Sequence, residues 1–289
     1  MSTGEKYDVI VIGGGPSGMM AAGRAAERGR RVLLIEKNKD LGKKLSTTGG
    51  GRCNILNAEE NTQKLLDKYG DATKFLHSPF SQHGMRESRT FFERRGLPIV
   101  VEARKRAFPQ SQTASDVTDT MKKYVTSNNV ELKKDTRVKG FKIKNGKIIG
   151  VETTGGVYSG EAYILATGGS SHQETGSTGE GMSWLSGLGH TVHKSTPDIV
   201  PLTVEDDWVK ELSGTTLSFM KITFGTDLTK KQGRFSCLGK ILFTHFGVSG
   251  PLILNAAYEV KKLLAKGHVR AVIDMYPDTD TGTLRRRIL

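Results

Sequence analysis

A glycine-rich hexapeptide near the N-terminus, Gly13-Gly14-Gly15-Pro16-Ser17-Gly18, has residue types and a spacing that suit it to hold a dinucleotide. Gly13 permits a tight turn, Gly15 lets the backbone approach a pyrophosphate, and Gly18 lets a helix pack against a strand. The helix that begins at Pro16 and Ser17 offers unpaired N–H groups to phosphates. Glu36 ends the next strand and can accept hydrogen bonds from ribose hydroxyls. A glycine-rich turn in an unliganded α/β domain is the alternative.

The segments around this turn have the pattern of a βαβ unit. Residues 6–12 are Val/Ile-rich and run directly into the glycines, which predicts a buried strand. Residues 16–27 carry Ala and Met at helical spacing, and residues 32–36 form a second apolar strand. This order implies a parallel sheet with a right-handed crossover.

Hydrophobic periodicity predicts further elements along the chain. Expected helices cover residues 61–69, 85–95, 114–127, 179–189 and 279–289. Expected strands cover residues 131–134, 138–144, 147–153, 156–158, 162–166, 218–224, 240–244 and 271–275. Residues 42–57 are expected to form a glycine-rich, basic loop, and Asn145-Gly146 is the strongest hairpin signal.

The hexapeptide alone does not distinguish FAD from NAD. Its position at the N-terminus favours FAD, since residues 163–169 downstream read as another strand ending in Ala-Thr-Gly-Gly. That strand would bring a second stretch of backbone close to the same dinucleotide. The chain has no second GxGxxG, and Gly176 to Gly181 has the wrong spacing for one. We therefore expect no separate nicotinamide-binding Rossmann domain.

Composition excludes several classes of protein. The 289 residues include 35 glycines without a collagen period, and a hydrophobic content of 36% suffices for a core. No apolar run approaches the roughly 18 residues of a membrane span, and no secretory signal is visible. The two cysteines, Cys53 and Cys237, exclude a disulfide scaffold and favour a reducing cytoplasm. The seven histidines show no HxH or HExxH spacing, so we expect no metal site.

Several longer segments carry a resemblance to a known family. The most specific are GGGRCN within residues 42–54 and FTHxGxSGP within residues 242–251. Residues 107–111, 114–117, 176–181 and 200–202 also match, in the expected order through the entire chain. The sequence resembles a family of bacterial FAD-dependent oxidoreductases, usually labelled aminoacetone-oxidase-family or BaiN-type flavoproteins.

The resemblance implies an α/β fold in which a Rossmann-like FAD-binding domain is interrupted by an inserted β-rich domain with its own small helical insertion. Strand-like segments predominate after Pro197, which places a domain boundary near residue 194. We therefore expect the FAD-binding domain over residues 1–193 and the β-rich domain over 194–276. Residues 277–289 would begin the helical insertion. The resemblance also implies a later return of the chain to the FAD domain, which is absent here. We therefore expect a C-terminally truncated piece, with a naturally truncated homologue as the alternative.

The resemblance places the glycines ending at Gly51 beside the flavin. Arg52 could then steady the pyrophosphate or the N1–C2=O region, where negative charge builds on reduced flavin, or it could serve the loop structure alone. Lys43 and Lys44 could reach phosphates or remain solvated. The residues that we expect to contact the cofactor are Gly13, Gly15, Pro16, Ser17, Gly18, Glu36, Lys37, Lys44, Gly51, Arg52, Cys53, Asn54, Val138, Ala166, Thr167 and Gly168.

Two residues are candidates for chemistry beyond that of the flavin. His245 could face the flavin as a proton donor or substrate ligand, and a structural histidine is the alternative. Cys53 lies in a loop similar to the active-site loop of disulfide reductases, but a partner cysteine is missing. A small packed residue is therefore favoured over dithiol chemistry at Cys53.

These observations favour an FAD-dependent oxidoreductase. NAD(P)H would dock transiently and reduce the flavin, and reduced flavin would pass a hydride to an unsaturated substrate. Activities assigned in the family include amine oxidation, reduction of bile-acid double bonds and uridine reduction in ribosomal RNA, and the fold cannot choose among them. Alternatives are a flavin amine oxidase and a non-catalytic nucleotide- or RNA-binding homologue.

The charge of the chain bears on the choice of substrate. The net charge is +13, with basic clusters at residues 104–106 and 285–287, which favours ribosomal RNA over a small molecule. Against RNA, these clusters lack interleaved aromatic residues. Both substrate classes remain open, no membrane partner is expected, and the sequence does not address the oligomeric state.

Overall fold

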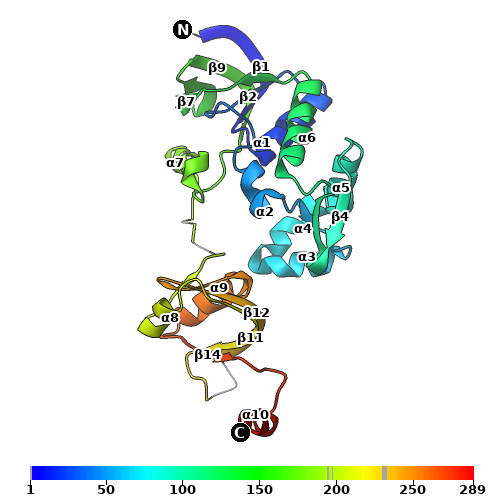
Figure 1. Ribbon diagram of the computed structural model, residues 1–289. Helices are drawn as coiled ribbons and strands as arrows, with labels where there is room; N and C mark the ends of the chain where they lie inside the picture. The colour runs from blue at the N-terminus through cyan, green and yellow to red at the C-terminus, as the bar shows by residue number, and fades with distance from the viewer. Residues whose placement is uncertain (1, 194, 197, 230–232) are drawn as a thin grey trace. The chain divides into compact units, whose positions relative to one another are not determined.

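The computed structural model describes residues 2–193, 195–196, 198–229 and 233–289 (Figure 1). The chain forms two compact units, Met1–His193 and Lys194–Leu289, which we call unit 1 and unit 2. Lys194, at which the sequence analysis placed a domain boundary, lies outside the described residues. Within the described part of the chain, no helix combines the length and the apolar character needed to cross a bilayer.

Unit 1 is built on a six-stranded sheet in the order β6-β2-β1-β9-β8-β7. The strands are β1 (Ser2–Ile12), β2 (Val32–Ile35), β6 (Glu131–Lys133), β7 (Val138–Lys144), β8 (Lys147–Thr153) and β9 (Gly156–Leu165). Strand β1 is central, with Val9 opposite both Val32 of β2 and Ala162 of β9 in parallel pairing. Helix α1 (Pro16–Glu27) connects β1 to β2, which confirms the expected Rossmann-like α/β fold.

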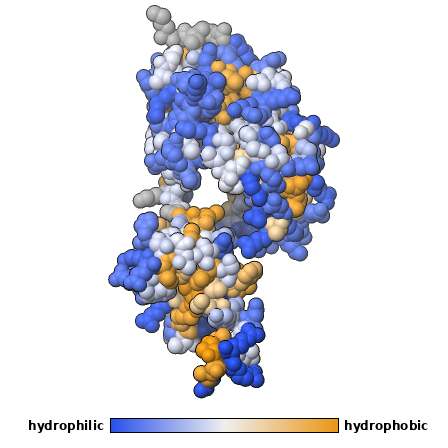
Figure 2. All heavy atoms as spheres, viewed as in Figure 1, coloured by the Kyte–Doolittle hydropathy of each residue, from blue (hydrophilic) through white to orange (hydrophobic). Residues whose placement is uncertain are grey.

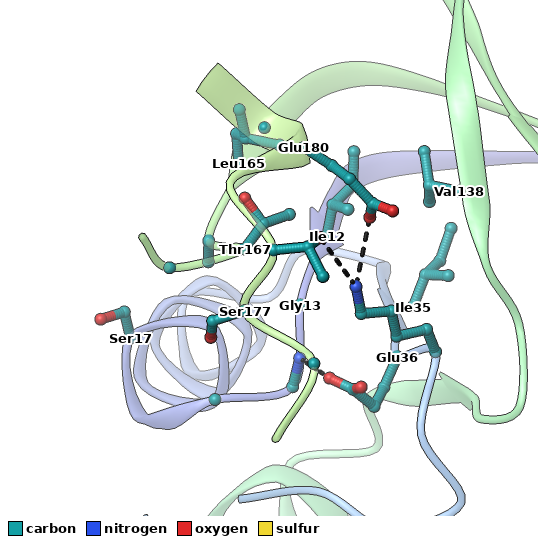
Figure 3. Close-up of a pocket in the computed structure, with 18 of the residues that line it drawn as sticks. Ile12, Gly13, Ser17, Ile35, Glu36, Val138, Leu165, Thr167, Ser177 and Glu180 are labelled. Atoms are coloured by element: carbon teal, nitrogen blue, oxygen red, sulfur yellow. Dashed lines mark hydrogen bonds and ion pairs between the residues drawn. The ribbon is translucent and has the colours of Figure 1, made fainter. Parts of the chain in front are cut away.

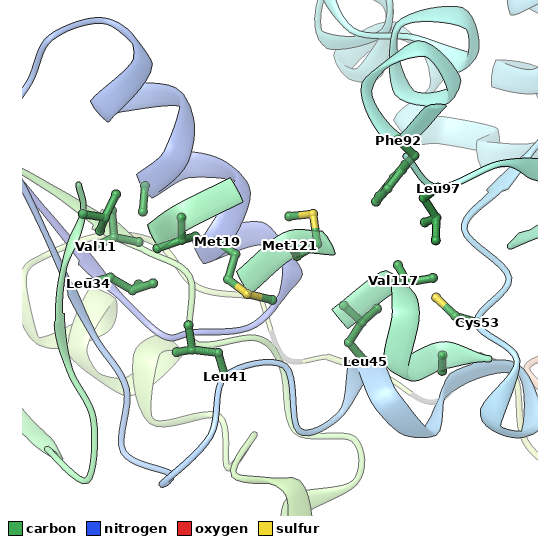
Figure 4. Close-up of a cluster of buried hydrophobic side chains, with 14 of the residues drawn as sticks. Val11, Met19, Leu34, Leu41, Leu45, Cys53, Phe92, Leu97, Val117 and Met121 are labelled. Atoms are coloured by element: carbon green, nitrogen blue, oxygen red, sulfur yellow. The ribbon is translucent and has the colours of Figure 1, made fainter. Parts of the chain in front are cut away.

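Two helices pack on one face of this sheet. Helix α1 contacts α6 (Ala114–Ser127), and both contribute to a buried cluster that includes Met19 and Met121 (Figure 4). The helices approach closely because α1 carries a glycine at the contact. A Cβ on Gly23 would lie 2.6 Å from Cδ1 of Tyr124. A second cluster lies on strands of the same sheet and consists of Tyr7, Ile10, Ile12, Leu33, Ile35, Val138, Val151 and Tyr158.

Tyr124 couples this helix contact to pH. Its side chain is buried, its phenol is hydrogen-bonded to Glu27, and the Arg95 guanidinium lies 4.3 Å from its ring centroid. Burial, and then the Glu27 carboxylate, raise the pKa of Tyr124 to about 12. The pKa of an unfolded tyrosine is about 10, so the protonated Tyr124 phenol stabilises the folded state fully below about pH 10. This contribution to the free energy of unfolding is lost as the pH rises towards 12.

We expect Tyr124→Phe to be less sensitive to alkali than the parent chain. Between about pH 9 and pH 12 the parent should lose roughly 2 kcal/mol more of its free energy of unfolding than the variant, at about 1.4 kcal/mol per unit of pKa difference. Urea titrations of both proteins across this range measure the difference. An identical alkaline loss in the two proteins would contradict the assignment.

Between β2 and α6 the chain builds a group of short elements, residues 45–109, which we call the small lobe. Its helical segments are η1 (Leu45–Thr47), α2 (Thr48–Gly51), α3 (Thr62–Leu66), η2 (Asp67–Ala72), α4 (Thr73–Gln82), α5 (Met85–Glu93) and η3 (Ala103–Lys105). Strands β3 (Leu56–Asn57), β5 (Arg106–Pro109) and β4 (Ile99–Glu102) form an antiparallel sheet in that order. The expectation of a loop over residues 42–57 was wrong in part, because η1, α2 and β3 lie within this range. Helix α4 was not predicted, because Pro79 lies within it and proline is unfavourable inside a helix.

The remaining elements of unit 1 follow β8. The sequence analysis divided β9 into two strands, but its polar centre continues to pair with β1, with Ser159 opposite Lys6 and Gly160 opposite Tyr7. The division was therefore wrong. After β9 come η4 (Gln173–Thr175) and α7 (Glu180–Gly187).

Unit 2 is a five-stranded antiparallel sheet in the order β10-β13-β12-β11-β14. Its elements are β10 (Leu202–Thr203), α8 (Asp207–Glu211), β11 (Thr216–Gly225), β12 (Arg234–Thr244), β13 (Gly247–Ser249), α9 (Pro251–Leu264), β14 (Arg270–Asp274) and α10 (Thr281–Ile288). Leu252, Ile253 and Val260 of α9 are buried in one cluster with Ile222 and Phe243 of the sheet. Helix α9 was not anticipated, although its apolar residues have helical spacing.

Candidate cofactor site

A cavity of about 590 Å³ lies at the carboxyl ends of β1, β2 and β9, where parallel α/β sheets bind ligands (Figure 3). The expected cofactor residues that line it are Gly13, Gly15, Pro16, Ser17, Glu36, Lys37, Lys44, Val138, Ala166, Thr167 and Gly168. The others, Gly18, Gly51, Arg52, Cys53 and Asn54, do not line it. The structure thus brings together residues from four separate stretches of the sequence.

The glycine turn at this cavity has a geometry that requires glycine at some positions and leaves space at another. Gly13 has a φ of +105°, and a Cβ there would lie 2.5 Å from the carbonyl oxygen of Ala166. A Cβ on Gly18 would overlap the carbonyl oxygen of Gly13, so Gly18 lets α1 begin close to β1. Gly15, in contrast, would meet no atom within 4 Å. Gly15 caps α1 without a side-chain hydrogen bond, so the N-terminus of the helix faces open space.

The Glu36 carboxylate is held at the end of β2, and the residue is only 7% exposed. Its Oε2 accepts a 2.6 Å hydrogen bond from the backbone N–H of Gly14, as Figure 3 shows. Its Oε1 accepts hydrogen bonds from the backbone N–H of Asn38 at 2.8 Å and from Asn38 Nδ2 at 2.7 Å. A carboxylate offers about four lone-pair positions, so one remains for a ligand hydroxyl.

Residues 170–181 form a segment that was not expected at the site, and residues 175–181 of it line the cavity. Glu180, the first residue of α7, pairs with Lys37 Nζ at 3.1 Å and with Arg137 Nη1 at 2.6 Å. Asn38 Nδ2 donates to the carbonyl oxygen of Thr175 at 3.2 Å. Glu180 and Asn38 are therefore site residues that were missed. The glycines at 176, 179 and 181 were the signal, and they were noted as a match to the family but were not assigned to the site.

Two lysines fasten the same segment. Lys44 Nζ donates to the carbonyl oxygen of Ser171 at 2.5 Å, and Lys43 Nζ donates to that of Glu174 at 3.0 Å. Both lysines line the cavity. They therefore link residues 170–181 to the loop that follows β2 and place positive charge beside the cavity.

We expect Glu180→Gln to loosen this segment. The variant loses the charge that pairs with Lys37 and Arg137, partly exposed contacts of about 1 kcal/mol together. The rate at which a bound dinucleotide dissociates should then rise by about fivefold, because 1 kcal/mol corresponds to that factor.

Glu174→Gln is the matched control for Glu180→Gln. Its carboxylate lies in the same segment but is 71% exposed and pairs with His172. Stopped-flow measurement of FAD release should therefore give an unchanged rate for this control. Equal rates for both variants would show that the Glu180 pairs do not hold the segment.

The Gly49–Arg52 loop lies outside the cavity lining but has an unusual backbone. Gly49, Gly50 and Gly51 have φ values of +58°, +67° and +83°, which side-chain-bearing residues rarely adopt. Arg52 Nη2 pairs with Glu102 Oε2 at 2.8 Å, while its guanidinium lies 3.9 Å from the ring centroid of Phe108. Its Nε is buried and has no partner among the described residues. Arg52 is thus held against strands β4 and β5 of the small lobe.

Cys53 and Asn54 continue this loop into the interior. Cys53 is 3% exposed and packs in the cluster with Leu45, Val117 and Leu97 (Figure 4). Burial raises the pKa of the Cys53 thiol, although a hydrogen bond with Thr48 opposes the shift. A buried, protonated thiol is a packing residue rather than a nucleophile. Rotating the Asn54 amide by half a turn lets it donate to the carbonyl oxygens of Leu56 and Ala107 at 3.1 and 3.2 Å.

His245 lies in unit 2, in the turn that joins β12 to β13. Its side chain is exposed, and its ring contacts that of Phe246 edge-on with centroids 4.9 Å apart. The following Gly247 has a φ of +153°, and a Cβ there would lie 2.8 Å from the backbone nitrogen of Val204. The His245 side chain is therefore accessible, while the backbone of the turn packs closely against Val204.

A family model described as the HI0933-like protein Rossmann domain matches residues 7–270. The chain belongs to this family. The matched range runs from β1 into β14 and so includes elements of both units. Membership in the HI0933-like family confirms the resemblance to BaiN-type flavoproteins.

Two curated relatives align with 279 residues, or 96% of this chain. The 3-dehydro-bile acid delta(4,6)-reductase of Clostridium scindens is 26% identical, and the ribosomal RNA dihydrouridine synthase of Escherichia coli is 25% identical. The chain spans 66% of the length of each, just under two thirds. Among solved structures, a 3-ketosteroid-delta4-(5alpha)-dehydrogenase from Rhodococcus jostii gives a TM-score of 0.46 at 14% identity, covering 57% of this chain and 46% of that one.

The residues around the cavity fit a dinucleotide. The open space at Gly15 and the uncapped start of α1 suit a pyrophosphate, which a side chain at this position would displace. Glu36 has capacity for a ribose hydroxyl, and the walls include Val138, Leu165 and Trp184, whose apolar surfaces suit a flat ring. All three requirements of a dinucleotide are met within one cavity.

Proposed function

We propose that unit 1 binds FAD in this cavity and that the protein is an FAD-dependent oxidoreductase. The observation that carries the proposal is the combination of open space at Gly15 with the buried Glu36 carboxylate 21 positions further along the chain. Gly13 to Ser17 would hold the pyrophosphate, Glu36 the adenosine ribose, and Lys37 and Lys44 the charge of the phosphates. Thr167 and Gly168 would support the same dinucleotide from the end of β9.

The flavin would supply hydride transfer, accepting a hydride from NAD(P)H and passing it to an unsaturated substrate. The printed names of two relatives share this chemistry, since a delta(4,6)-reductase and a dihydrouridine synthase both saturate a carbon–carbon double bond. Residues of the chain would bind and orient the cofactor and exclude water.

We propose His245 as the proton donor, because its ring is exposed in a closely packed turn. We assign residues 194–276 to the inserted β-rich domain and 277–289 to the beginning of the helical insertion.

Anaerobic titration of the FAD-reconstituted chain with NADPH and NADH tests this function. Bound flavin absorbs near ~450 nm, and the band should bleach on addition of one of the two nucleotides and return on addition of an acceptor with a conjugated double bond. Bleaching by an amine instead of NAD(P)H would favour the amine oxidase. A chain that binds FAD but is reduced by neither would contradict the reductase assignment.

A second observation bears on the substrate. A net charge of +13 favours a polyanionic substrate such as RNA, and the relative named as a ribosomal RNA dihydrouridine synthase has the same coverage as the bile acid reductase. We therefore propose uridine in ribosomal RNA as the substrate. Deletion of the gene should remove dihydrouridine from ribosomal RNA, as measured by mass spectrometry of nucleosides. Unchanged dihydrouridine would favour a small-molecule substrate.

A further inference from the structure

The hairpin between β4 and β5 places two cations where the backbone disfavours them. Arg104 and Lys105 have φ values of +61° and +58°, in the left-handed region that asparagine and glycine normally occupy. Both lie in the connection between Glu102 and Arg106, which are opposite each other in the ladder. Strained residues of this kind persist where another requirement selects them.

The hairpin between β7 and β8 shows the usual arrangement in the same unit. There the left-handed positions are taken by Asn145 and Gly146, with φ values of +51° and +71°. The lysines at 144 and 147 lie on the adjacent strand positions, where the backbone is relaxed. The β4–β5 hairpin therefore differs from the β7–β8 hairpin in placing cations where asparagine and glycine would be relaxed.

The charge at the β4–β5 hairpin is only partly neutralised. Arg104 is exposed and forms no ion pair with any residue in the described part of the chain, while Lys105 pairs with Glu59 at 2.6 Å. The guanidinium of Arg106 lies 5.7 Å from the ring centroid of Phe108, the ring that also carries Arg52. Basic side chains thus extend from the hairpin to Arg52, where Glu102 pairs with the guanidinium.

The same lobe exposes two aromatic rings. Phe75 of α4 is 78% exposed and Tyr69 of η2 is 48% exposed, and Lys74 and Lys68 precede them directly. Figure 2 shows an apolar patch within hydrophilic surface where Figure 1 labels α5 and β4, which belong to the same lobe. Exposed aromatics beside cations are typical of surfaces on which the bases of single-stranded nucleic acid stack.

We propose that the small lobe binds single-stranded RNA, with the cations of Arg52, Arg104, Lys105 and Arg106 on phosphates and the exposed rings of Tyr69 and Phe75 on bases. The assignment rests on the proposed function, in which the substrate is a uridine of RNA. Because a base in a duplex is stacked and paired, the reacting uridine must be unpaired when it reaches a flavin. A docking surface that binds single strands in the same unit as the cofactor site would hold the RNA in that form.

The test uses the FAD-reconstituted chain and a fluorescent single-stranded oligouridylate, with binding followed by anisotropy at several salt concentrations. The double variant Arg104→Asn/Lys105→Gly removes two cations and installs residues that prefer the left-handed backbone. We expect it to be more stable to urea, to bind RNA at least tenfold more weakly at low salt, and to lower the slope of log K against log salt by about 1.4. Phe75→Ala should weaken binding by about tenfold without changing that slope.

The double variant Lys144→Ser/Lys147→Ser, on the β7–β8 hairpin, is the control with the same change in charge. It should retain RNA affinity within about twofold, because general attraction between charges is the only term it alters. Equal loss of affinity in the two double variants would overturn the proposal, as would a duplex or polyglutamate that competes as well as oligouridylate. FAD content and NAD(P)H bleaching are measured on the same samples, so a failure of RNA docking is distinguished from a failure of the flavin assignment.

Discussion

Gly15→Val is expected to abolish FAD binding and leave the fold intact. Gly15 has a φ of −74°, which valine adopts, and an added Cβ would meet no protein atom within 4 Å. The free energy of unfolding should therefore change by less than about 1 kcal/mol, the scale of glycine's conformational effect. The new side chain would instead occupy the space that a pyrophosphate needs at the start of α1. We expect the affinity for FAD to fall by at least a factor of about 1,000, since losing phosphate contacts to charged or N–H groups costs roughly 4 kcal/mol or more.

The control for this substitution is Gly187→Val. Gly187 ends α7, is exposed, and likewise would meet no atom within 4 Å. This variant should bind FAD like the parent chain. Fluorescence quenching of FAD, measured with urea denaturation on the same preparations, separates binding from folding. Normal FAD affinity in Gly15→Val would mean that the dinucleotide does not cross the start of α1.

Glu36→Gln is expected to reduce both FAD affinity and stability. Each oxygen of the carboxylate accepts hydrogen bonds, from Gly14 on one side and Asn38 on the other. An amide has only one oxygen, so either orientation sets an NH₂ group against an N–H donor. Hydrogen bonds to a charged group contribute about 1.5–3 kcal/mol, which predicts a loss of FAD affinity of roughly tenfold to 100-fold and a comparable loss of folding stability.

The matched control is Glu161→Gln on β9. The Glu161 side chain is 60% exposed and pairs with Lys6 at 3.0 Å, a surface ion pair that contributes little. Calorimetric titration with FAD and thermal unfolding should both match the parent chain. If Glu36→Gln behaves like this control, the carboxylate neither shapes the turn nor contacts the cofactor.

The part of the site around β1 and α1 could be predicted because its signals are local. The helix over residues 16–27 was predicted with the bounds that the structure has, since Pro16 can begin a helix and the glycines before it define the turn. The helix over residues 114–127 and the turn at Asn145-Gly146 were confirmed for the same reason. In each case the residues that decide the conformation lie within a few positions of one another.

Other parts of the site depend on contacts that span long stretches of sequence. Lys37 and Glu180 are 143 positions apart, and nothing near either residue indicates that they pair. The burial of Cys53 arises from packing against Val117 and Leu97, which belong to other elements of the fold. The exposure of the Tyr69 and Phe75 rings was likewise not predicted, because these rings lie outside the basic clusters at residues 104–106 and 285–287. Side-chain exposure is a tertiary property, which periodicity alone does not give.

Calorimetric titration of the purified chain with FAD tests most directly whether the cavity of unit 1 binds this cofactor. One FAD should bind per chain, and the heat of binding should disappear in Gly15→Val but persist in Gly187→Val. A chain that is folded by circular dichroism and gives no heat with FAD would contradict the account. So would a Gly15→Val variant that takes up FAD as well as the parent.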